Sequence, residues 1–165
     1  MESQRLQTAK KYIDYFKTLD RDTLASVLAQ NYKHEFAPAS LAPPGPFTRD
    51  QFLEHNAALR KIMTGFPAHA KEYVESEASN QVTVWATARA RFRDEVVEDG
   101  VAGDDEEDRK KKWDYEGEYV FMMWMDETGE KVVRTVEFLD SKATEYELRP
   151  LLKTANEKMQ TQGTF

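Results

Sequence analysis

One histidine lies on the buried face of a strand that the sequence predicts over residues 31–36. Tyr32, His34 and Phe36 alternate with charged residues, so they share one face of that strand. A histidine titrates near neutrality and can both take and return a proton, which makes His34 a candidate catalytic group. The alternative is a core histidine that is hydrogen-bonded to a neighbour. Tyr32 and Phe36 are candidate substrate-binding residues on the same face.

Glu137 is the second candidate catalytic residue. It has the same strand parity as Thr135 and Leu139, whereas Arg134 has the opposite parity. A carboxylate that lines an apolar cavity has its pKa raised by desolvation and becomes usable as an acid or a base. In the alternative, the parity is reversed and Glu137 pairs with a surface arginine.

Aromatic residues on two further elements complete the candidate binding site. Tyr115, Tyr119 and Phe121 alternate along one strand, and Gly117 leaves a gap between them that suits a ligand. Small residues on the preceding strand face them, so ordinary large-against-small core packing is the competing explanation. His55 or Asn56 falls within the apolar stripe of a predicted helix that begins with Phe52, and His55 is added as a substrate-binding candidate.

Hydrophobic periodicity, capping residues and proline predict the helices and strands that must position these residues. Helical spacing covers residues 2–19, Asp20 caps a second short helix, and Thr48 with Gln51 forms a capping box for a third. Alternation then predicts a run of antiparallel strands, and a last helix begins near Arg149 because Pro150 suits only a first turn. The predicted strands are residues 31–36, 68–78, 81–93, 113–125 and 131–139.

The opposite face of the sheet carries charge and two exposed tryptophans. Arginines on two strands face Glu116 and Glu118, which is typical of a cross-strand charge ladder. Trp85 and Trp124 share this face and are too apolar for open solvent. An apolar patch rimmed by charge indicates association, so we expect a homodimer through this face.

Length, composition and charge limit the number of domains, the cysteine chemistry and the partners that this chain can have. The 165 residues fit a single domain, 1–165, and the absence of cysteine excludes disulfides, thiolate zinc sites and cysteine nucleophiles. Residues 94–108 hold nine carboxylates and no basic residue, which leaves the remainder of a chain of net charge −7 at +2. We therefore expect an acidic, mobile insertion over about residues 94–112 and no nucleic-acid partner.

No nucleotide-binding or metal-binding pattern accompanies these features. The sequence has no glycine-rich phosphate loop, and its three histidines, His34, His55 and His69, fall on separate elements. We therefore predict no cofactor and no metal. No apolar run reaches the length of a membrane span and no leader is evident, so the expected location is cytoplasmic, with no membrane partner.

The opening of the chain resembles that of the nuclear transport factor 2-like (SnoaL-like) superfamily. The similarity is carried by residues 12–24, YIDYFKTLDRDTL, followed by the aromatic strand; it extends over about residues 5–158. Fungal members are resembled more narrowly at residues 34–41, 113–121 and 136–141. The resemblance implies an α+β, cone-shaped fold in which a curved antiparallel sheet packs against N-terminal helices around a cavity.

Relatives of this kind include ketosteroid isomerase, scytalone dehydratase, polyketide cyclases and fungal meroterpenoid isomerases, and others that only bind partners. The resemblance places Tyr12 where ketosteroid isomerase keeps its oxyanion-hole tyrosine, but it places Phe36 at the position of that enzyme's basic aspartate. The steroid-isomerase mechanism therefore does not carry over.

The resulting hypothesis is a cofactor-free isomerase, cyclase or dehydratase acting on a small hydrophobic carbonyl compound of polyketide- or terpenoid-like character. His34 would move protons, Glu137 would assist, and Tyr12 or Tyr119 would hold the oxygen where charge develops. The alternative is a non-catalytic small-molecule-binding or dimerisation module of the same fold, whose cavity is filled by its own side chains.

Overall fold

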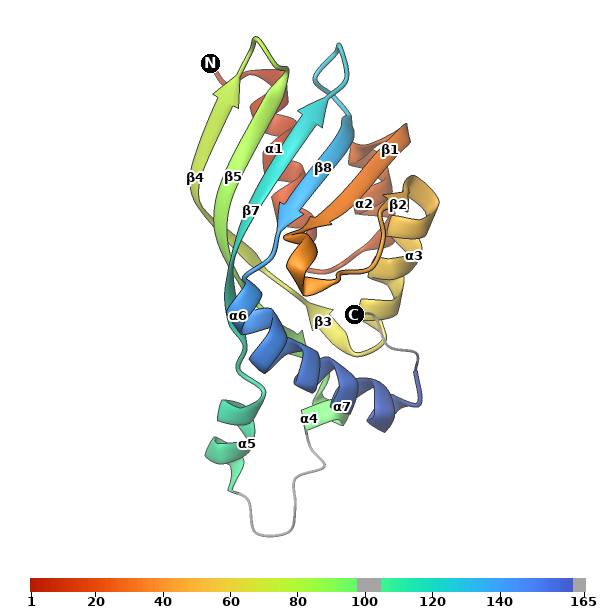
Figure 1. The fold of residues 1–165 in the computed structure, drawn as a ribbon, viewed down its shortest axis with the longest axis vertical. Helices are drawn as coiled ribbons and strands as arrows, with labels where there is room; N and C mark the ends of the chain where they lie inside the picture. Colours follow the sequence, from red (N-terminus) through yellow and green to blue (C-terminus); the bar gives the residue numbers. More distant parts are fainter. Residues whose placement is uncertain (98–104, 162–165) are drawn as a thin grey trace.

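A computed structural model describes residues 1–97 and 105–161. Three helices precede most of the sheet, and a further helical segment follows its last strand (Figure 1). The helices are α1 (Gln4–Tyr15), α2 (Arg21–Val27), α3 (Arg49–Arg60), α4 (Asp94–Val97), α5 (Glu106–Lys112), α6 (Ser141–Ala143) and α7 (Arg149–Met159). The strands are β1 (Leu28–Ala37), β2 (Phe47–Thr48), β3 (Met63–Gly65), β4 (Ala68–Ser76), β5 (Gln81–Arg89), β6 (Arg91–Phe92), β7 (Glu116–Met125) and β8 (Val132–Phe138).

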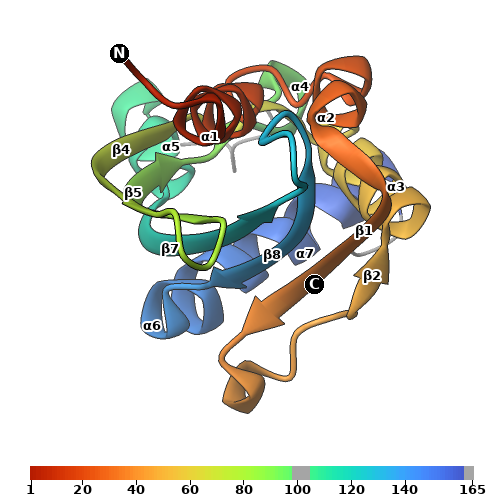
Figure 2. The same ribbon diagram turned by 90° about the horizontal axis from the view of Figure 1, so that it is seen from above.

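The main sheet has the strand order β2-β1-β8-β7-β5-β4. It curves strongly, and α1, α2 and α3 lie on its concave side (Figure 2). The predicted α+β class, with N-terminal helices packed against a curved sheet, is therefore confirmed. The prediction of a wholly antiparallel sheet was wrong for one pair, because β1 and β8 run parallel. Two parallel strands need a long connection between them. Here the connection is the chain from the end of β1 at Ala37 to the start of β8 at Val132.

Strand alternation determines which side chains enter the core. On β5, Val82, Val84 and Ala86 are fully buried, whereas Trp85 between them is 42% exposed. The N-terminal helices begin where the sequence indicates, since Asp20 caps α2 and Thr48 forms the expected capping box at α3 with Gln51. As a result, the aromatic face of β1 packs against the inner face of α3, where Tyr32 and His34 contact Phe52.

The last helix, α7, begins at Arg149 with Pro150 in its first turn, as predicted. Two short helical elements that were not predicted precede it. Asp140 caps α6, and the chain continues through a π-helical turn, Thr144–Leu148, into α7. This segment crosses the narrow end of the sheet (Figure 1), where Leu148 closes one side of the interior.

The acidic segment is more structured at its edges than its composition predicts. Residues 94–97 form α4, and Val96 is fully buried, with its carbonyl oxygen accepting a hydrogen bond from Lys158 of α7 at 2.7 Å. After residues 98–104, which lie outside the described residues, α5 pairs Glu106 with Lys110. The expectation of an unpacked insertion over 94–112 is therefore wrong at its first edge, where Val96 is buried, whereas α5 at its second edge has no buried residue.

Candidate active site

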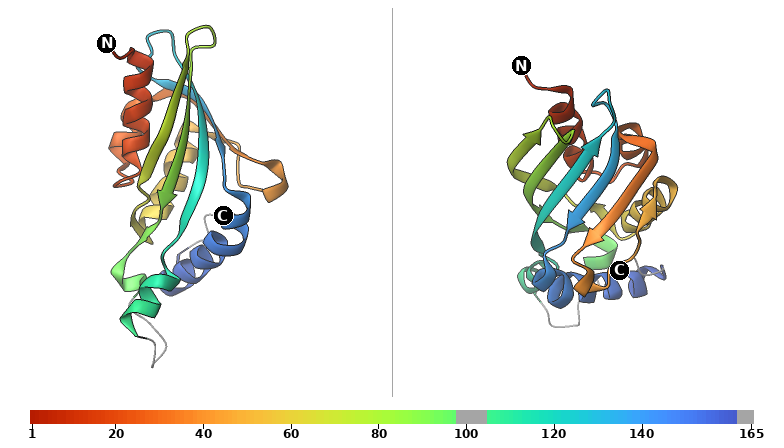
Figure 3. Two further views of the ribbon diagram at one scale, coloured as in Figure 1. Left: turned by 90° about the vertical axis from the view of Figure 1, so that its left-hand side faces the viewer. Right: turned by 45° about the horizontal axis from the view of Figure 1, so that its top comes forward.

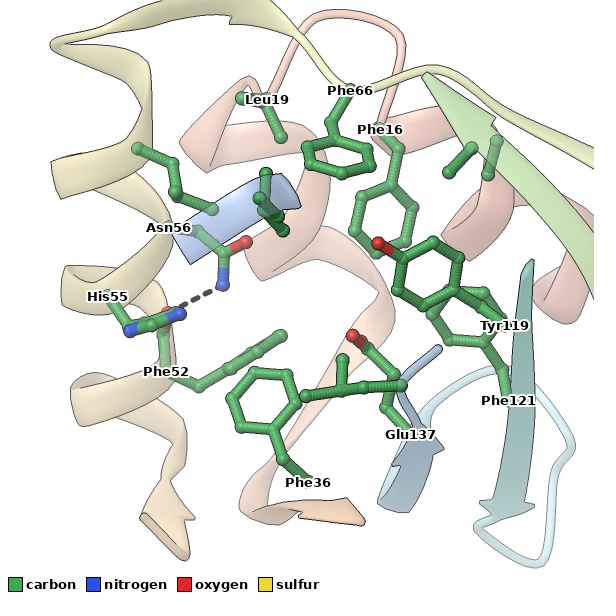
Figure 4. A pocket seen from close by; sticks show the side chains of 15 residues that line it. Phe16, Leu19, Phe36, Phe52, His55, Asn56, Phe66, Tyr119, Phe121 and Glu137 are labelled. Carbon is green, nitrogen blue, oxygen red and sulfur yellow. Dashed lines mark hydrogen bonds between the residues drawn. The ribbon is translucent and has the colours of Figure 1, made fainter. Parts of the chain in front are cut away.

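The concave side of the sheet encloses a cavity of about 50 Å³ between α1, α3 and the inner faces of β7 and β8 (Figure 4). Its polar side chains are few: Glu137 from β8, Tyr119 from β7, and His55 and Asn56 from α3. Aromatic rings make up much of the remaining wall. The phenylalanines among them are Phe16, Phe36, Phe52, Phe66 and Phe121.

Glu137 projects from β8 into this apolar space. The side chain is almost entirely buried, at 7% exposure for the residue, and desolvation raises its pKa from the usual 4.5 to about 8. At neutral pH the group is therefore mostly a neutral acid that is close to its titration point. Such a carboxyl group can give up or accept a proton at little cost.

His34 lies behind Glu137 and does not line the cavity. Its ring stacks on Phe52, with centroids 3.8 Å apart, and Nε2 lies 3.6 Å from Oε1 of Glu137. Burial, together with the positive charge that His55 can carry, lowers the pKa of His34 well below 6.5. The expectation that His34 opens onto the cavity was wrong, because the ring of Phe52 covers it from α3.

Two tyrosines extend this buried polar chain away from the cavity. The Tyr32 hydroxyl lies 2.7 Å from Nδ1 of His34, and the Tyr12 hydroxyl lies 3.3 Å from that of Tyr32. Burial raises the pKa of both tyrosines, so their hydroxyls remain protonated. Neither tyrosine lines the cavity, contrary to their expected contact with substrate. A hydrogen-bonded row of Tyr12, Tyr32 and His34 therefore supports Glu137 from behind.

A second tyrosine pair lies on β7 and at its entry. The Tyr119 hydroxyl reaches the cavity and lies 2.7 Å from the Tyr115 hydroxyl, which is behind it. Tyr115 was expected to bind substrate but does not line the cavity, and its ring packs edge-on against that of Phe66, with centroids 5.9 Å apart. Gly117 makes the pair possible, since a β-carbon there would lie 2.3 Å from the Tyr115 hydroxyl oxygen. Burial raises the pKa of Tyr119 well above 10, so it remains a hydrogen-bond donor.

Four expected substrate-binding residues do line the cavity: Phe36, His55, Tyr119 and Phe121. Burial lowers the pKa of His55 to about 4, so its ring is neutral at physiological pH. Within residues 1–97 and 105–161, no three side chains of histidine, aspartate or glutamate come together in a way that would hold a metal ion. The polar groups that line the cavity are a carboxyl, a phenol, an imidazole and a carboxamide.

Sequence reasoning missed several residues of the wall. Phe52 and Asn56 are one helical turn apart on α3, and both positions fell within the apolar stripe of that helix. A polar amide at a stripe position is the one signal that pointed to Asn56. Phe16 and Phe66 approach each other because the Phe66 amide donates to the Phe16 carbonyl at 2.7 Å, a contact between distant segments that periodicity cannot reveal.

The sequence matches no protein-family model, and no curated protein resembles it in sequence. Solved structures, by contrast, match it closely in fold. PrhC from Penicillium brasilianum NBRC 6234 superposes with a TM-score of 0.74 at 14% identity, over 95% of this chain and 94% of its own. The BvnE pinacolase from Penicillium brevicompactum gives 0.69 at 18% identity, over 86% and 89% of the two chains.

An NTF2-like protein of Burkholderia pseudomallei K96243 gives a TM-score of 0.64 at 13% identity, over 88% of this chain and 98% of its own. At these identities the similarity establishes the architecture and leaves the chemistry to the site itself. The helix order, the curved sheet and the interior cavity agree with that architecture. The chain therefore has the nuclear transport factor 2-like (SnoaL-like) fold that its opening residues indicated.

Proposed function

We propose that this chain is a cofactor-free enzyme that moves protons on a small hydrophobic carbonyl compound, as an isomerase, cyclase or dehydratase of polyketide- or terpenoid-like substrates. One observation carries the proposal: the Glu137 carboxyl faces an apolar cavity, and burial raises its pKa to about 8. Structural similarity to the BvnE pinacolase supports small-molecule chemistry in this fold.

In the proposed reaction, the Glu137 carboxylate takes a proton from the carbon next to the ligand carbonyl. The C–H electron pair moves into a carbon–carbon double bond, and the carbonyl oxygen gains charge. The Tyr119 hydroxyl donates a hydrogen bond to that oxygen, since the Tyr115 hydroxyl 2.7 Å away can donate to Tyr119 in turn. Glu137 then returns its proton to a different atom of the same ligand.

His34 acts in this proposal as a positioning residue. With the Tyr32 hydroxyl donating to Nδ1 at 2.7 Å, the imidazole proton is on Nε2, which faces the Glu137 carboxyl at 3.6 Å. An N–H directed at the carboxylate stabilises it once it has formed. Tyr12 extends the same row. The proposed roles of His34 and Glu137 are thus exchanged relative to the sequence-based hypothesis, because only Glu137 reaches the cavity.

Exchange of carbon-bound hydrogen for deuterium tests this function without knowledge of the natural substrate. In D₂O, the protein is expected to accelerate exchange at the position next to the carbonyl in one or more members of a panel of one- and two-ring ketones. The rate should rise with pH and level off above about pH 8, because only the carboxylate form of Glu137 is a base. Proton NMR of the ketone, against a protein-free blank at each pH, measures the rate.

The small volume of the cavity, about 50 Å³, favours one competing function, a non-catalytic binding module. That module would bind the same ketones and would leave their exchange rate at the blank value. Binding without exchange across the panel would therefore replace the enzyme proposal with this alternative.

We further propose a homodimer through the outer face of β5 and β7. Within the described part of the chain, no helix covers the upper half of this face (Figure 3), and Trp85 is 42% exposed there. Lys71 lies 4.2 Å over the Trp85 ring, and the indole Nε1 of Trp85 donates to Glu118 at 3.1 Å. Balanced charges around an apolar centre suit a second copy of the same surface.

Substituting glutamate for Trp85 should weaken this dimer about 30-fold, because a central aromatic residue is replaced by a charge beside Glu118. Sedimentation equilibrium over a range of concentrations measures the dissociation constant. Tyr146→Glu is the matched control, since Tyr146 is equally an exposed aromatic residue but lies in the π-helical turn. A wild-type protein that is monomeric at micromolar concentration would contradict the dimer.

A further inference from the structure

Asn56 presents one end of its carboxamide to the cavity, and the other end is fixed by the helix. The residue lies on the inner face of α3 and is 4% exposed. Its Nδ2 donates a hydrogen bond of 2.8 Å to the backbone carbonyl of Phe52, one turn earlier. A carbonyl oxygen can only accept a hydrogen bond, so the amide nitrogen must face the helix backbone. The side-chain oxygen consequently faces away from the backbone and toward the cavity (Figure 4).

A second asparagine in the same chain shows what completes this arrangement. Asn156 on α7 is also 4% exposed, and its Nδ2 also donates at 2.8 Å to a carbonyl one turn earlier, that of Leu152. Its side-chain oxygen accepts a hydrogen bond from the Thr161 hydroxyl at 2.6 Å. Across residues 1–97 and 105–161, the Asn56 oxygen has no such donor. An amide oxygen that opens onto an apolar cavity without a protein donor favours a ligand that supplies a donor.

We infer that the Asn56 side-chain oxygen accepts a hydrogen bond from a hydroxyl group of the ligand, so that the site takes a hydroxy-carbonyl compound in preference to a simple ketone. The carbonyl half of this inference rests on the proposed function. The expected ligand hydroxyl rests on Asn56 alone, because among the cavity residues within 1–97 and 105–161 no other is fixed by a backbone contact as a pure acceptor.

The polar groups of the cavity also set the direction in which such a ligand binds. Glu137 in its neutral form and Tyr119 are donors on the sheet side, whereas Asn56 is an acceptor on the helix side (Figure 4). A ligand carbonyl next to the Asn56 oxygen would bring lone pairs together and lose its hydrogen bonds. The carbonyl therefore lies against β7 and β8, within reach of Glu137, and the hydroxyl lies against α3.

Matched ligands test the inference in the wild-type protein. Cyclohexanones and 1-tetralones that carry one hydroxyl or methyl group at the same ring position differ in size very little, the methoxy compound is larger by one carbon, and only the hydroxyl can donate. For the position that suits the site, the hydroxyl compound is expected to bind about tenfold more tightly than either partner. Isothermal titration calorimetry measures the affinities. Equal affinities within every matched set, or no binding by any hydroxy-ketone, would overturn the inference.

Two asparagine variants locate the preference. Asn56→Leu removes the acceptor and should reduce the hydroxyl-to-methyl affinity ratio to about one. Asn156→Leu removes the same motif from α7, away from the cavity, and should keep the wild-type ratio. A ratio that survives Asn56→Leu assigns the preference to another residue and overturns the proposal. If Asn56→Leu fails to fold, the methoxy and hydroxyl ligands still decide the question in the wild type.

Binding and exchange separate the failure of this inference from the failure of the proposed function. A hydroxyl preference that depends on Asn56, without deuterium exchange, supports the inference and removes the enzyme proposal. Exchange without any hydroxyl preference has the opposite meaning, since it supports the enzyme and removes the role of Asn56.

Discussion

Replacing Glu137 with glutamine is expected to lower the rate of deuterium exchange into a bound ketone about a thousandfold, to the level of the protein-free blank. The amide keeps the size and polarity of the side chain but has no carboxylate to take a proton, and proton transfer by a positioned group contributes effects of this order. Proton NMR in D₂O at pH 8 measures the loss. Ligand affinity should change far less than the rate, because the amide fills the same part of the cavity wall.

Glu35→Gln provides the matched control for that experiment. Glu35 lies on β1 with its side chain on the exposed face, so the same substitution removes a carboxylate that cannot reach the cavity. It should keep the wild-type rate. A Glu137→Gln protein that still exchanges at the wild-type rate would show that another group is the base.

The same Glu137→Gln substitution is expected to stabilise the protein at neutral pH. The pKa of Glu137 is about 8 in the folded protein and about 4.5 in an unfolded chain, so the folded state holds this proton more tightly. The associated stabilisation is complete below pH 4.5 and is lost as the pH rises toward 8. Between pH 4.5 and pH 7, this linkage should lower the wild-type free energy of unfolding by about 3 kcal/mol. The glutamine side chain does not titrate, so the free energy of unfolding of the variant has no such decrease.

Urea unfolding of the wild type and the variant at a series of pH values measures this difference. The variant's advantage should grow with pH up to about 8, and titrating groups that do not contact Glu137 contribute equally in both proteins. Glu35→Gln should follow the wild type throughout. An advantage that is constant with pH would mean that Glu137 has an ordinary pKa, and it would remove the main support for acid–base chemistry.

Alternation along the strands predicted which side chains face inward but not how deep each one lies. His34 and Glu137 both point to the concave side, as their parity requires. Only Glu137 reaches the cavity, because Phe52 from α3 stacks on the His34 ring at 3.8 Å. The contact between Phe52 and His34 depends on how α3 crosses β1, and local sequence patterns do not determine that crossing. The sequence therefore predicts the members of the buried row but not their order.

The parallel pairing of β1 with β8 could not be predicted from the sequence for a related reason. Local patterns showed where β1 and β8 lie, but their parallel pairing depends on how the two strands meet after folding. The start of α7 at Arg149 was predicted because Pro150 is a local signal for a first helical turn. The short helix α6, which Asp140 caps, was not predicted, because three residues are too few to show helical periodicity.

The parallel pairing of β1 with β8 has a consequence for the order of events on the ribosome. His34 pairs with Thr135, so among the described residues β1 has the two-residue strand β2 as its one neighbour until β8 has been made. Contacts this distant along the sequence slow folding, since closing the long intervening loop costs entropy before the contacts can form. The nascent chain therefore holds the aromatic face of β1 without its second neighbouring strand, and the Glu137 carboxyl reaches His34 only after β8 has been made.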